Sequence, residues 1–260
     1  MYEVNSRRHF HNLLTLGNRL AYIAWKLSKS PKSFQCRIRN GPTFSMRPAP
    51  SADWTTAVEI FLLGIYDLGS DDSVCKIVDL GGNVGYSCLF WCWSYPHATV
   101  ITFEPHPLHC DLLEQHLKQN RYQDRVKLVR AGGAPFSSTA TLTDDGVGSS
   151  IVRQMGSTPS IEVELVDFFE TVGPGPIDIL KMDIEGAEYA IMQDDRFGEL
   201  AARVRHLIME WHVYEPSHLG AEWCRQRLEG LGFQVEMGLS RGRQYGLLKA
   251  FRSAKTSTTI

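Results

Sequence analysis

The stretch KIVDLGGNVGYSCLFW, residues 76–91, decides how the chain folds. An apolar run ends on an acid, Asp79, and three glycines follow within five residues, Gly81, Gly82 and Gly85, before an apolar helix begins. Glycines allow a ligand to approach the backbone closely, and the start of a helix presents N–H groups to it. An acid beside such a turn repels pyrophosphate, so the stretch favours a ligand that carries hydroxyl groups or positive charge.

From Val74 onward, apolar runs alternate with helix-like segments. The runs that read as strands cover residues 76–80, 99–104, 126–131, 177–183, 206–212, 233–237 and 245–251. Helical periodicity marks residues 84–94, 107–119, 186–193 and 221–231. This alternation requires crossover connections, so it predicts an α/β fold with a doubly wound, mostly parallel seven-stranded sheet. Only a short segment, GLSRGRQ (238–244), joins the last two runs, which predicts a C-terminal antiparallel strand at the end of the sheet.

The remaining segments predict an appendage and an insertion. Residues 8–29 have the spacing of an amphipathic helix, which would pack on the main domain or on a second copy of the chain, or form a lid or a membrane-surface contact. Residues 34–48 read as two short extended segments around Asn40–Gly41, and a further helix follows Asp53, a candidate N-cap. Residues 132–176 form a Gly-, Ser- and Thr-rich insertion with a short strand near IEVEL. We therefore divide the chain into a helical and extended appendage (1–72), the main domain (73–254) and a disordered tail (255–260).

The composition argues against several classes of function. A formal net charge of −2 over 260 residues gives no global field towards nucleic acid or an anionic membrane. The sequence contains no apolar run of 18 residues, so no transmembrane segment is expected, and its first 30 residues lack the apolar core of a signal peptide. The six cysteines form no C-x-x-C pair and are expected to be reduced. We expect a cytoplasmic protein with a small-molecule partner and no nucleic-acid partner. One interpretation of the N-terminal helix is that it forms the contact of a homodimer.

Four of the predicted strands end on an acid. These acids are Asp79, Glu104, Asp183 and Glu210. A single acid in this position is usually solvated or caps a helix. Ligands of open parallel sheets bind outside the carboxyl ends of the strands, where all four acids would meet. Together they indicate a ligand with hydroxyl groups and positive charge.

The spacing of the glycine loop separates two kinds of nucleotide-type cofactor. A dinucleotide fingerprint has the form G-x-G-x-x-G, whereas this loop reads D-x-G-x-N-x-G from Asp79 to Gly85, with Asn83 in the place of a glycine. Glu104, 25 residues after Asp79, can accept two ribose hydroxyls. S-adenosylmethionine fits, because it has a ribose, an ammonium and a sulfonium but no phosphate. The alternatives are an NAD(P)-dependent oxidoreductase and, outside enzymes, a non-catalytic cofactor-binding protein.

The segments VDLGGNVGYS, FEPHP, KMDIEGAEY and MEWH together resemble the FkbM family of S-adenosylmethionine-dependent methyltransferases, which have the class I, Rossmann-like fold. The resemblance extends from about Phe34 to Phe251. It implies a cofactor site with Asp79, Gly81, Asn83 and Gly85 around the methionine moiety and ribose, Glu104 at the ribose hydroxyls, Phe103 and Pro105 in the adenosine slot, Ala131 and Gly132 at the adenine, and Asp183 nearby. Arg130 stands where the family commonly has asparagine, and Gly82 where it commonly has alanine. The resemblance also implies O-methylation of a hydroxyl on a sugar, polyketide or other secondary metabolite, with S-adenosylhomocysteine as the second product.

An alcohol acceptor loses its proton during methyl transfer, so a base or a metal ion is expected near the methyl group. The candidates are Asp183, Glu185, Glu188, Glu210 and His212. We favour His212 as the base because an imidazole titrates near neutrality, with Glu210 or Glu185 orienting it or binding acceptor hydroxyls. In the alternative interpretation, Glu185 and Glu188 only cap the following helix. A divalent metal ion held by Asp183, Glu210 and His212 is less favoured, although oxygen ligands suit Mg²⁺.

The acceptor pocket itself has no recognisable motif. The first 70 residues and residues 134–160 are its candidates, because appendages and insertions build such pockets in doubly wound enzymes. The histidines with no evident partner are expected to lie at the surface or in packing; they are His9, His11, His97, His106, His109, His206 and His218.

Overall fold

The computed structural model describes residues 27, 32–48, 50–144, 149–150, 160–213, 219–241 and 244–252. Apart from Leu27, the predicted N-terminal helix over residues 8–29 lies outside these residues, and so does the predicted disordered tail at 255–260. Among the described helices, none is long and apolar enough to cross a bilayer. All six cysteines carry free thiols, as predicted, and only Cys75 is exposed.

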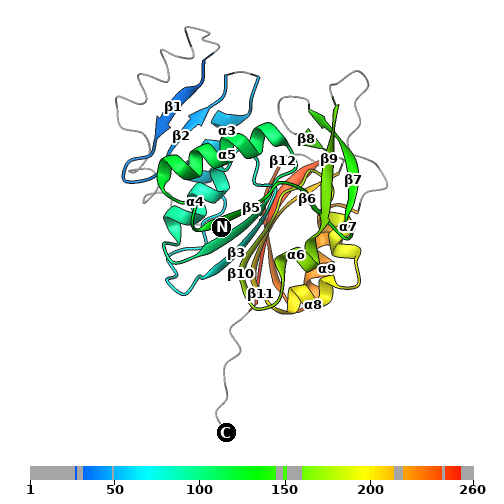
Figure 1. Ribbon diagram of the computed structural model, residues 1–260. Coiled ribbons are helices and arrows are strands. Elements are labelled where there is room, and N and C mark those ends of the chain that lie inside the picture. Colours follow the sequence, from blue (N-terminus) through cyan, green and yellow to red (C-terminus); the bar gives the residue numbers. More distant parts are fainter. Residues whose placement is uncertain are drawn as a thin grey trace.

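The seven strands predicted from Lys76 onward form one sheet (Figure 1). They are β3 (Lys76–Leu80), β4 (Thr99–Phe103), β5 (Val126–Val129), β10 (Ile177–Met182), β11 (Val204–His212), β12 (Gln234–Arg241) and β13 (Tyr245–Phe251). Their order is β12-β13-β11-β10-β3-β4-β5, and the pairs among β11, β10, β3, β4 and β5 are all parallel. The predicted doubly wound, mostly parallel sheet is confirmed.

The antiparallel strand is not at the end of the sheet, where the sequence placed it. β13 pairs antiparallel with both β11 and β12, so it lies one strand inside the edge. The chain leaves β11 through α9 (Gly220–Gly230) and lays down β12 first, parallel to the other strands. The hairpin after β12 then returns the chain into the gap beside β11.

Helices cover both faces of this sheet (Figure 1). One face packs against α4 (Tyr86–Ser94) and α5 (Pro107–Asn120), and the other against α6 (Phe168–Val172), α7 (Glu188–Gln193), α8 (Phe197–Ala202) and α9. Side chains alternate along each strand, so Ile77 joins the core beneath α4, whereas its neighbour Val78 joins the opposite core. The short helices α6 and α8 were not predicted, because five or six residues are too few to show a helical period.

The order of the strands changes direction between β3 and β10. From β3 the chain proceeds outward through β4 and β5, and from β10 it proceeds the other way to β11. The loops after β3 and β10 therefore diverge and leave a crevice between them, which is where ligands of doubly wound sheets bind.

The N-terminal part of the described chain packs on α4 and α5. β1 (Phe34–Arg37) and β2 (Thr43–Met46) form the predicted antiparallel pair, and α3 (Asp53–Ala57) continues directly into a π-helical turn, η1 (Val58–Leu62). The ring centroid of Phe44 on β2 lies 5.2 Å from that of Phe61 on η1. These elements share one hydrophobic core with α4 and α5.

The prediction that Asp53 is the N-cap of α3 is wrong. Ala52 holds that position, and Asp53 is the first helical residue. The Asp53 carboxylate instead accepts the backbone N–H of Arg47 at 2.6 Å and pairs with the Arg47 guanidinium at 2.7 Å. It also accepts the hydroxyl of Tyr86 at 3.0 Å, so it ties β2 and α3 to the first residue of α4. The partners of this carboxylate are therefore Arg47 and Tyr86 rather than the N–H groups at the start of α3.

The insertion forms a small sheet of its own rather than a single strand. β6 (Gly132–Ala134), β7 (Ser138–Asp144), β8 (Ser149–Ser150) and β9 (Ser160–Asp167) are arranged in the order β6-β9-β7-β8. Only β9 has the alternation of charged and aliphatic residues that the sequence analysis recognised. β7 is rich in Ser and Thr, and its pairing with β9 rather than its own pattern makes it a strand.

Candidate active site

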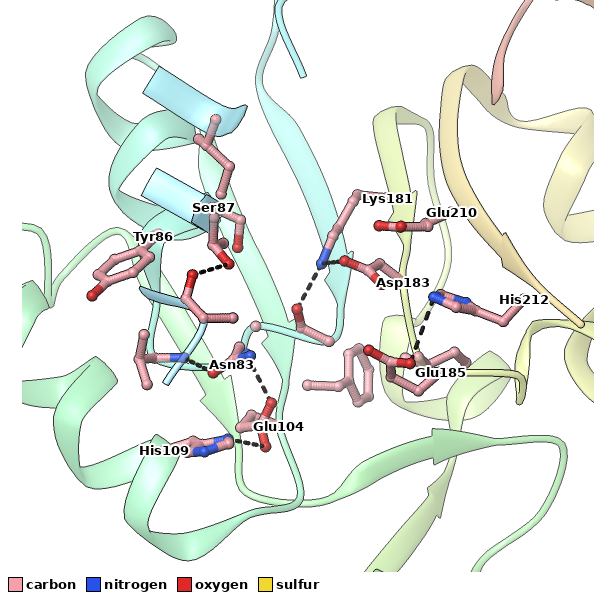
Figure 2. Close-up of a pocket in the computed structure, with 18 of the residues that line it drawn as sticks. Asn83, Tyr86, Ser87, Glu104, His109, Lys181, Asp183, Glu185, Glu210 and His212 are labelled. Atoms are coloured by element: carbon pink, nitrogen blue, oxygen red, sulfur yellow. Dashed lines mark hydrogen bonds and ion pairs between the residues drawn. The ribbon is translucent and has the colours of Figure 1, made fainter. Parts of the chain in front are cut away.

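A cavity of about 560 Å³ opens at the carboxyl ends of β3, β4, β10 and β11 (Figure 2). Each of these ends contributes to its wall, through residues 81–84, 103–105, 183–185, 210 and 212–213. Residues of the N-terminal part, between Arg47 and Tyr66, close it on another side. Most of the predicted site residues line this cavity: Gly81, Asn83, Phe103, Glu104, Pro105, Gly132, Asp183, Glu185, Glu210 and His212.

The glycine loop touches its neighbours so closely that side chains are excluded. Gly81 has φ +86°, and a Cβ built on it would lie 1.9 Å from the carbonyl oxygen of Asp183. A Cβ on Gly82 would lie 2.3 Å from Oγ1 of Thr102. At residue 82, where alanine is commoner, a glycine leaves room for the side chain of Thr102 on β4. The loop and the end of β10 form one contiguous wall.

Glu104 follows β4 and faces the cavity with a 7% exposed side chain. Its Oε2 accepts the backbone N–H of Asn83 at 2.8 Å, and its Oε1 accepts that of His106 at 2.9 Å. Each carboxylate oxygen can accept a further hydrogen bond, so the side chain can bind two vicinal hydroxyls. His109, expected at the surface or in packing, also lines the cavity, with Nδ1 3.5 Å from Oε1 of Glu104.

Asp79 lies behind the cavity wall rather than in it. Its side chain is completely buried, with Oδ1 3.1 Å from Nζ of Lys181 and Oδ2 accepting from the indole N–H of Trp91 at 3.2 Å. Asp79 can therefore act on a ligand only through Lys181 and the loop. Gly85 and Ala131, two further predicted contacts, also lie outside the cavity lining.

Lys181 is a site residue that the sequence analysis missed. It is 2% exposed, donates to the carbonyl oxygen of Gly81 at 2.6 Å, and lies 3.6 Å from Oδ2 of Asp183. Burial lowers its pKa, but the charge of Asp79, with that of Asp183, outweighs burial and holds the pKa well above its usual value. Lys181 is therefore a permanent cation that fixes the loop to β10. A lysine inside the apolar run IDILKM is itself the sequence signal.

On the opposite side of the cavity from Glu104, three of the four predicted catalytic residues come close together (Figure 2). Oε2 of Glu185 lies 3.6 Å from Nε2 of His212. Ligand atoms of Asp183, Glu185 and His212 all lie within 4.8 Å of one another. Glu210, two residues before His212 on β11, also lines the cavity. The metal set predicted from the sequence was Asp183, Glu210 and His212; the structure groups Glu185, rather than Glu210, with Asp183 and His212.

Glu188 contacts both His212 and the loop that carries Glu185. It is the first residue of α7 and completely buried. Its Oε1 and Oε2 accept the backbone N–H groups of Ile184 and Gly186 at 2.8 and 2.9 Å. Oε1 also lies 3.3 Å from Nδ1 of His212. Glu188 therefore accepts backbone N–H groups just before α7, as the helix-capping interpretation predicted, and it also orients His212. The carboxylate of Glu185, to which the same interpretation gave a capping role, faces the imidazole of His212.

The charges of this cluster shift its pKa values. Burial lowers the pKa of His212, but the hydrogen bond and charge of Glu188, with the charges of Asp183 and Glu185, raise it to about 9. Burial and the charge of Asp183 raise the pKa of Glu210 to about 8. In the protein without ligands, His212 is thus cationic at neutral pH. This differs from the expectation of an imidazole that titrates near neutrality, which did not include three surrounding carboxylates.

Comparison with known proteins identifies the family of this chain. The family model of the methyltransferase FkbM domain matches residues 79–235, more than half of the chain. Methyltransferase sdnD of Sordaria araneosa is 28% identical over 214 residues, which cover 68% of this chain and 80% of that protein. Methyltransferase 1 of Beauveria bassiana (strain ARSEF 2860) is 26% identical over 172 residues, which cover 56% of this chain and 69% of that protein.

Solved structures with similarity include a precorrin-6y C5,15-methyltransferase from Geobacter metallireducens GS-15, at 12% identity and a TM-score of 0.47, with 81% of this chain and 94% of that chain covered. Another is an O-methyltransferase family protein from Burkholderia thailandensis, at 15% identity and a TM-score of 0.45. The match covers 76% of this chain and 57% of that chain. The sequence motifs carry the stronger evidence, since the matched segment runs from Asp79 through the glycine loop, Glu104 and the Asp183–His212 region to β12. The chain belongs to the FkbM family of methyltransferases.

Proposed function

We propose that this protein is an S-adenosylmethionine-dependent O-methyltransferase whose acceptor is a hydroxyl of a small molecule, such as a sugar, a polyketide or another secondary metabolite. One observation carries the proposal. A carboxylate suited to ribose, that of Glu104, and a cluster suited to acid–base chemistry, around His212, face the same cavity from opposite sides (Figure 2). A cofactor that spans the cavity from Glu104 brings its methyl group towards that cluster.

The cofactor assignments follow from the wall of the cavity. Glu104 accepts the ribose hydroxyls, and Phe103, Pro105 and Gly132 border the adenosine. Gly81 and Asn83 approach the methionine moiety with their backbone, and Asp183 attracts its ammonium group. Lys181, which lines the cavity, holds the loop in place, and Asp79 acts on the cofactor only through Lys181 and the loop.

Methyl transfer is an in-line displacement at the sulfonium carbon, so alignment of the acceptor oxygen supplies much of the acceleration. The acceptor oxygen must lose its proton as the new O–C bond forms. Two routes meet this requirement. In the first, His212 releases its own Nε2 proton to solvent and then accepts the hydroxyl proton there; in the second, His212 is a ligand of a metal ion that acidifies the hydroxyl. In both routes Glu188 orients the imidazole. Glu185 binds the hydroxyl or the ion, and Glu210 binds the hydroxyl. The two routes differ in their response to a chelator.

A small-molecule acceptor is proposed because acids dominate this side of the cavity. Glu59, Asp183 and Glu185 line it, and such a surface repels the phosphates of a nucleic acid. The N-terminal part, residues 1–72 in our division, supplies Arg47, Thr56, Glu59 and Tyr66 to the same wall. We propose that this part, with the insertion, selects the acceptor. Deletion of residues 1–30 should then spare cofactor binding and impair turnover of the acceptor.

The test is calorimetry followed by turnover. S-adenosylhomocysteine should bind with one site per chain, and NAD should not bind. Incubation of S-adenosylmethionine with hydroxylated sugars, polyketides and a short RNA should then give S-adenosylhomocysteine release with one acceptor class, and mass spectrometry should place the methyl group on oxygen. Failure to bind S-adenosylhomocysteine would refute the cofactor; methylation of carbon, nitrogen or the RNA would refute the acceptor assignment.

A further inference from the structure

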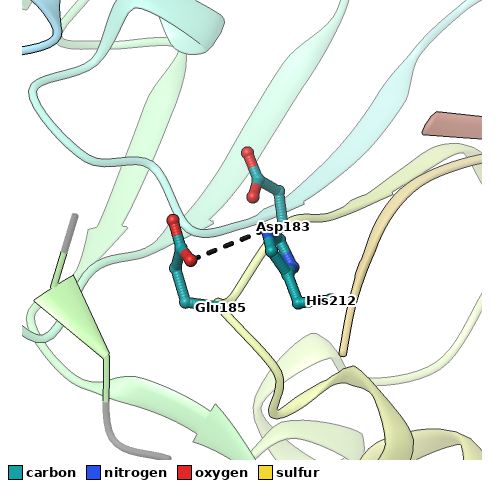
Figure 3. Close-up of side chains that lie close together, drawn as sticks. All are labelled: Asp183, Glu185 and His212. Atoms are coloured by element: carbon teal, nitrogen blue, oxygen red, sulfur yellow. Dashed lines mark ion pairs between the residues drawn. The ribbon is translucent and has the colours of Figure 1, made fainter. Parts of the chain in front are cut away.

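Asp183, Glu185 and His212 form a set of ligands that converge from two strand ends (Figure 3). Asp183 follows β10 directly, Glu185 lies in the loop after it, and His212 is the last residue of β11. Because β10 and β11 are parallel neighbours, their carboxyl ends place these side chains together. One ligand atom from each residue lies within 4.8 Å of the other two. A divalent ion with bonds of about 2.0–2.2 Å can contact all three after small side-chain rotations.

The imidazole of His212 is prepared as a ligand. It is 4% exposed, and its Nδ1 lies 3.3 Å from the buried carboxylate of Glu188. A carboxylate at Nδ1 fixes the proton there and directs Nε2 to the other side, where Oε2 of Glu185 lies at 3.6 Å. A histidine that donates its second N–H to a carboxylate is the usual arrangement behind a protein-bound metal ion. The site therefore combines two carboxylates with an imidazole whose orientation is fixed by a third, buried carboxylate.

Asp183 uses one carboxylate oxygen for its contacts with Lys181 and Tyr66. The contacts to Nζ of Lys181 at 3.6 Å and to the hydroxyl of Tyr66 at 3.4 Å both use Oδ2. This leaves Oδ1 as the candidate ligand atom and fixes the rotation of the carboxylate. Side chains of Asp183 and Glu185 are 25% and 34% exposed, so an ion can enter from the cavity and keep water ligands.

We propose that Asp183, Glu185 and His212 bind one divalent metal ion, with Mg²⁺ or Mn²⁺ as the class that two carboxylates and one imidazole fit. The remaining coordination positions face the cavity, where an acceptor hydroxyl can join the ion and become easier to deprotonate. This use of the ion rests on the proposed methyltransferase function, but its binding does not. In the metal-bound protein, Nε2 of His212 is a ligand and not the base.

The experiment measures binding of Mn²⁺ directly. Tag-free protein is stripped with chelator and titrated with Mn²⁺, and the electron paramagnetic resonance signal of free Mn²⁺ reports the bound fraction. One saturable ion per chain is expected. Glu185→Gln and His212→Gln should each weaken binding at least tenfold, and Glu188→Gln by about 10–100-fold, the usual effect of removing a group that orients a ligand.

Two variants separate coordination from general charge. Glu59→Gln removes one acid from the same cavity wall and should leave the Mn²⁺ affinity within about threefold of wild type. Glu210→Gln should have a similarly small effect, because Glu210 is not grouped with the three ligands. A loss of Mn²⁺ binding in Glu210→Gln with retention in Glu185→Gln would contradict the ligand set proposed here.

Binding of S-adenosylhomocysteine to each metal-stripped variant is measured in parallel. It should resemble wild type in the ligand variants, which shows that they are folded. Absence of saturable Mn²⁺ binding in a protein that binds S-adenosylhomocysteine would overturn the metal site and leave the methyltransferase proposal intact. Binding of Mn²⁺ with no binding of S-adenosylhomocysteine would do the reverse.

Discussion

Oε1 of Glu188 lies 3.3 Å from Nδ1 of His212, and both side chains are almost completely buried. The same carboxylate accepts two backbone N–H groups of the loop that carries Glu185. A single buried acid thus sets the orientation of the imidazole and the path of the loop that faces it. The side of the cavity that holds His212 and Glu185 depends on this side chain even though it does not line the cavity.

Replacement of His212 should affect turnover far more than cofactor binding. His212→Ala should lower kcat by roughly 10²–10⁴, the usual contribution of a positioned acid–base group. Affinity for S-adenosylhomocysteine should hardly change, because Glu104 and the glycine loop lie on the other side of the cavity. Chelator-treated wild type is assayed beside the variant. Full activity in His212→Ala would remove His212 from the mechanism, and full activity with chelator would assign it as the base.

Replacement of Glu104 should have the opposite profile. Glu104→Ala should weaken binding of S-adenosylhomocysteine by about 1.5–3 kcal/mol, the range for hydrogen bonds to a charged group. Isothermal titration calorimetry measures this loss. Glu164→Ala, on the exposed side of β9, is the control and should bind like wild type. Equal affinities in the two variants would show that the ribose is not at Glu104.

Two glycines with the same backbone conformation should respond differently to alanine. Gly81 and Gly69 have φ of +86° and +88°, but a Cβ on Gly81 meets the Asp183 carbonyl at 1.9 Å, whereas a Cβ on Gly69 meets no atom within 4 Å. Gly69→Ala should cost about 1–2 kcal/mol for the left-handed conformation. Gly81→Ala should cost about 1–3 kcal/mol more, because the backbone must move. Urea denaturation measures both; similar losses would mean that the loop can shift away from β10 freely.

The buried pair of Lys181 and Asp79 should be intolerant of losing its cation. Lys181→Met leaves the fully buried Asp79 carboxylate without its partner and should cost about 3–5 kcal/mol of unfolding free energy. Lys76→Met, the same change at the half-buried start of β3, should cost less than about 1.5 kcal/mol, because Nζ of Lys76 donates only to the carbonyl oxygens of Val172 and Pro174. Addition of Asp79→Asn to Lys181→Met should restore part of the loss. No restoration would assign the loss to packing.

His116 should make the stability of the N-terminal hairpin depend on pH. Its Nε2 accepts the backbone N–H of Ser45 at 2.9 Å and its Nδ1 lies 2.7 Å from the carbonyl oxygen of Val84, so the buried ring is neutral. Burial lowers its pKa below 6.5, so its contribution is complete above pH 6.5 and is lost as the pH falls through the lowered pKa. The urea midpoint of wild type should therefore fall more between about pH 7 and pH 5 than that of His116→Gln. Parallel pH profiles would contradict this.

Much of the fold was predictable because the decisive signals are local. The seven runs became the seven strands of the sheet, since apolar alternation with helices leaves few arrangements. The place of β13 was not predictable, because a hairpin can add outside or inside the preceding strand with the same local pattern. β7 was missed because its residues become a strand only by pairing with β9.

The site was predictable where the fold itself presents a residue. Glu104, Asp183, Glu210 and His212 end parallel strands, so they had to meet at one edge. Asp79 also ends a strand, but its side chain points to the α4 face, where Lys181 and Trp91 hold it. The sequence alone does not show that Asp79 is paired with Lys181 inside the fold while the other strand-end acids face the cavity. Glu188 gave a signal only as a helix-start residue, since its contact with His212 joins residues 24 apart.

The position of β13 has a consequence for how the protein is made. β13 pairs residue by residue with β11, with Leu247 opposite Glu210 and Tyr245 opposite His212. It follows every other strand of the sheet in chain order, so β11 keeps an open edge on the ribosome until residues 245–251 have emerged. The glycine loop and Glu104 belong to strands that precede β10 and β11 in the chain. We therefore expect the half of the cavity that holds Glu104 to form first, and the half that holds His212 to be complete only when residues 245–251 pair with β11.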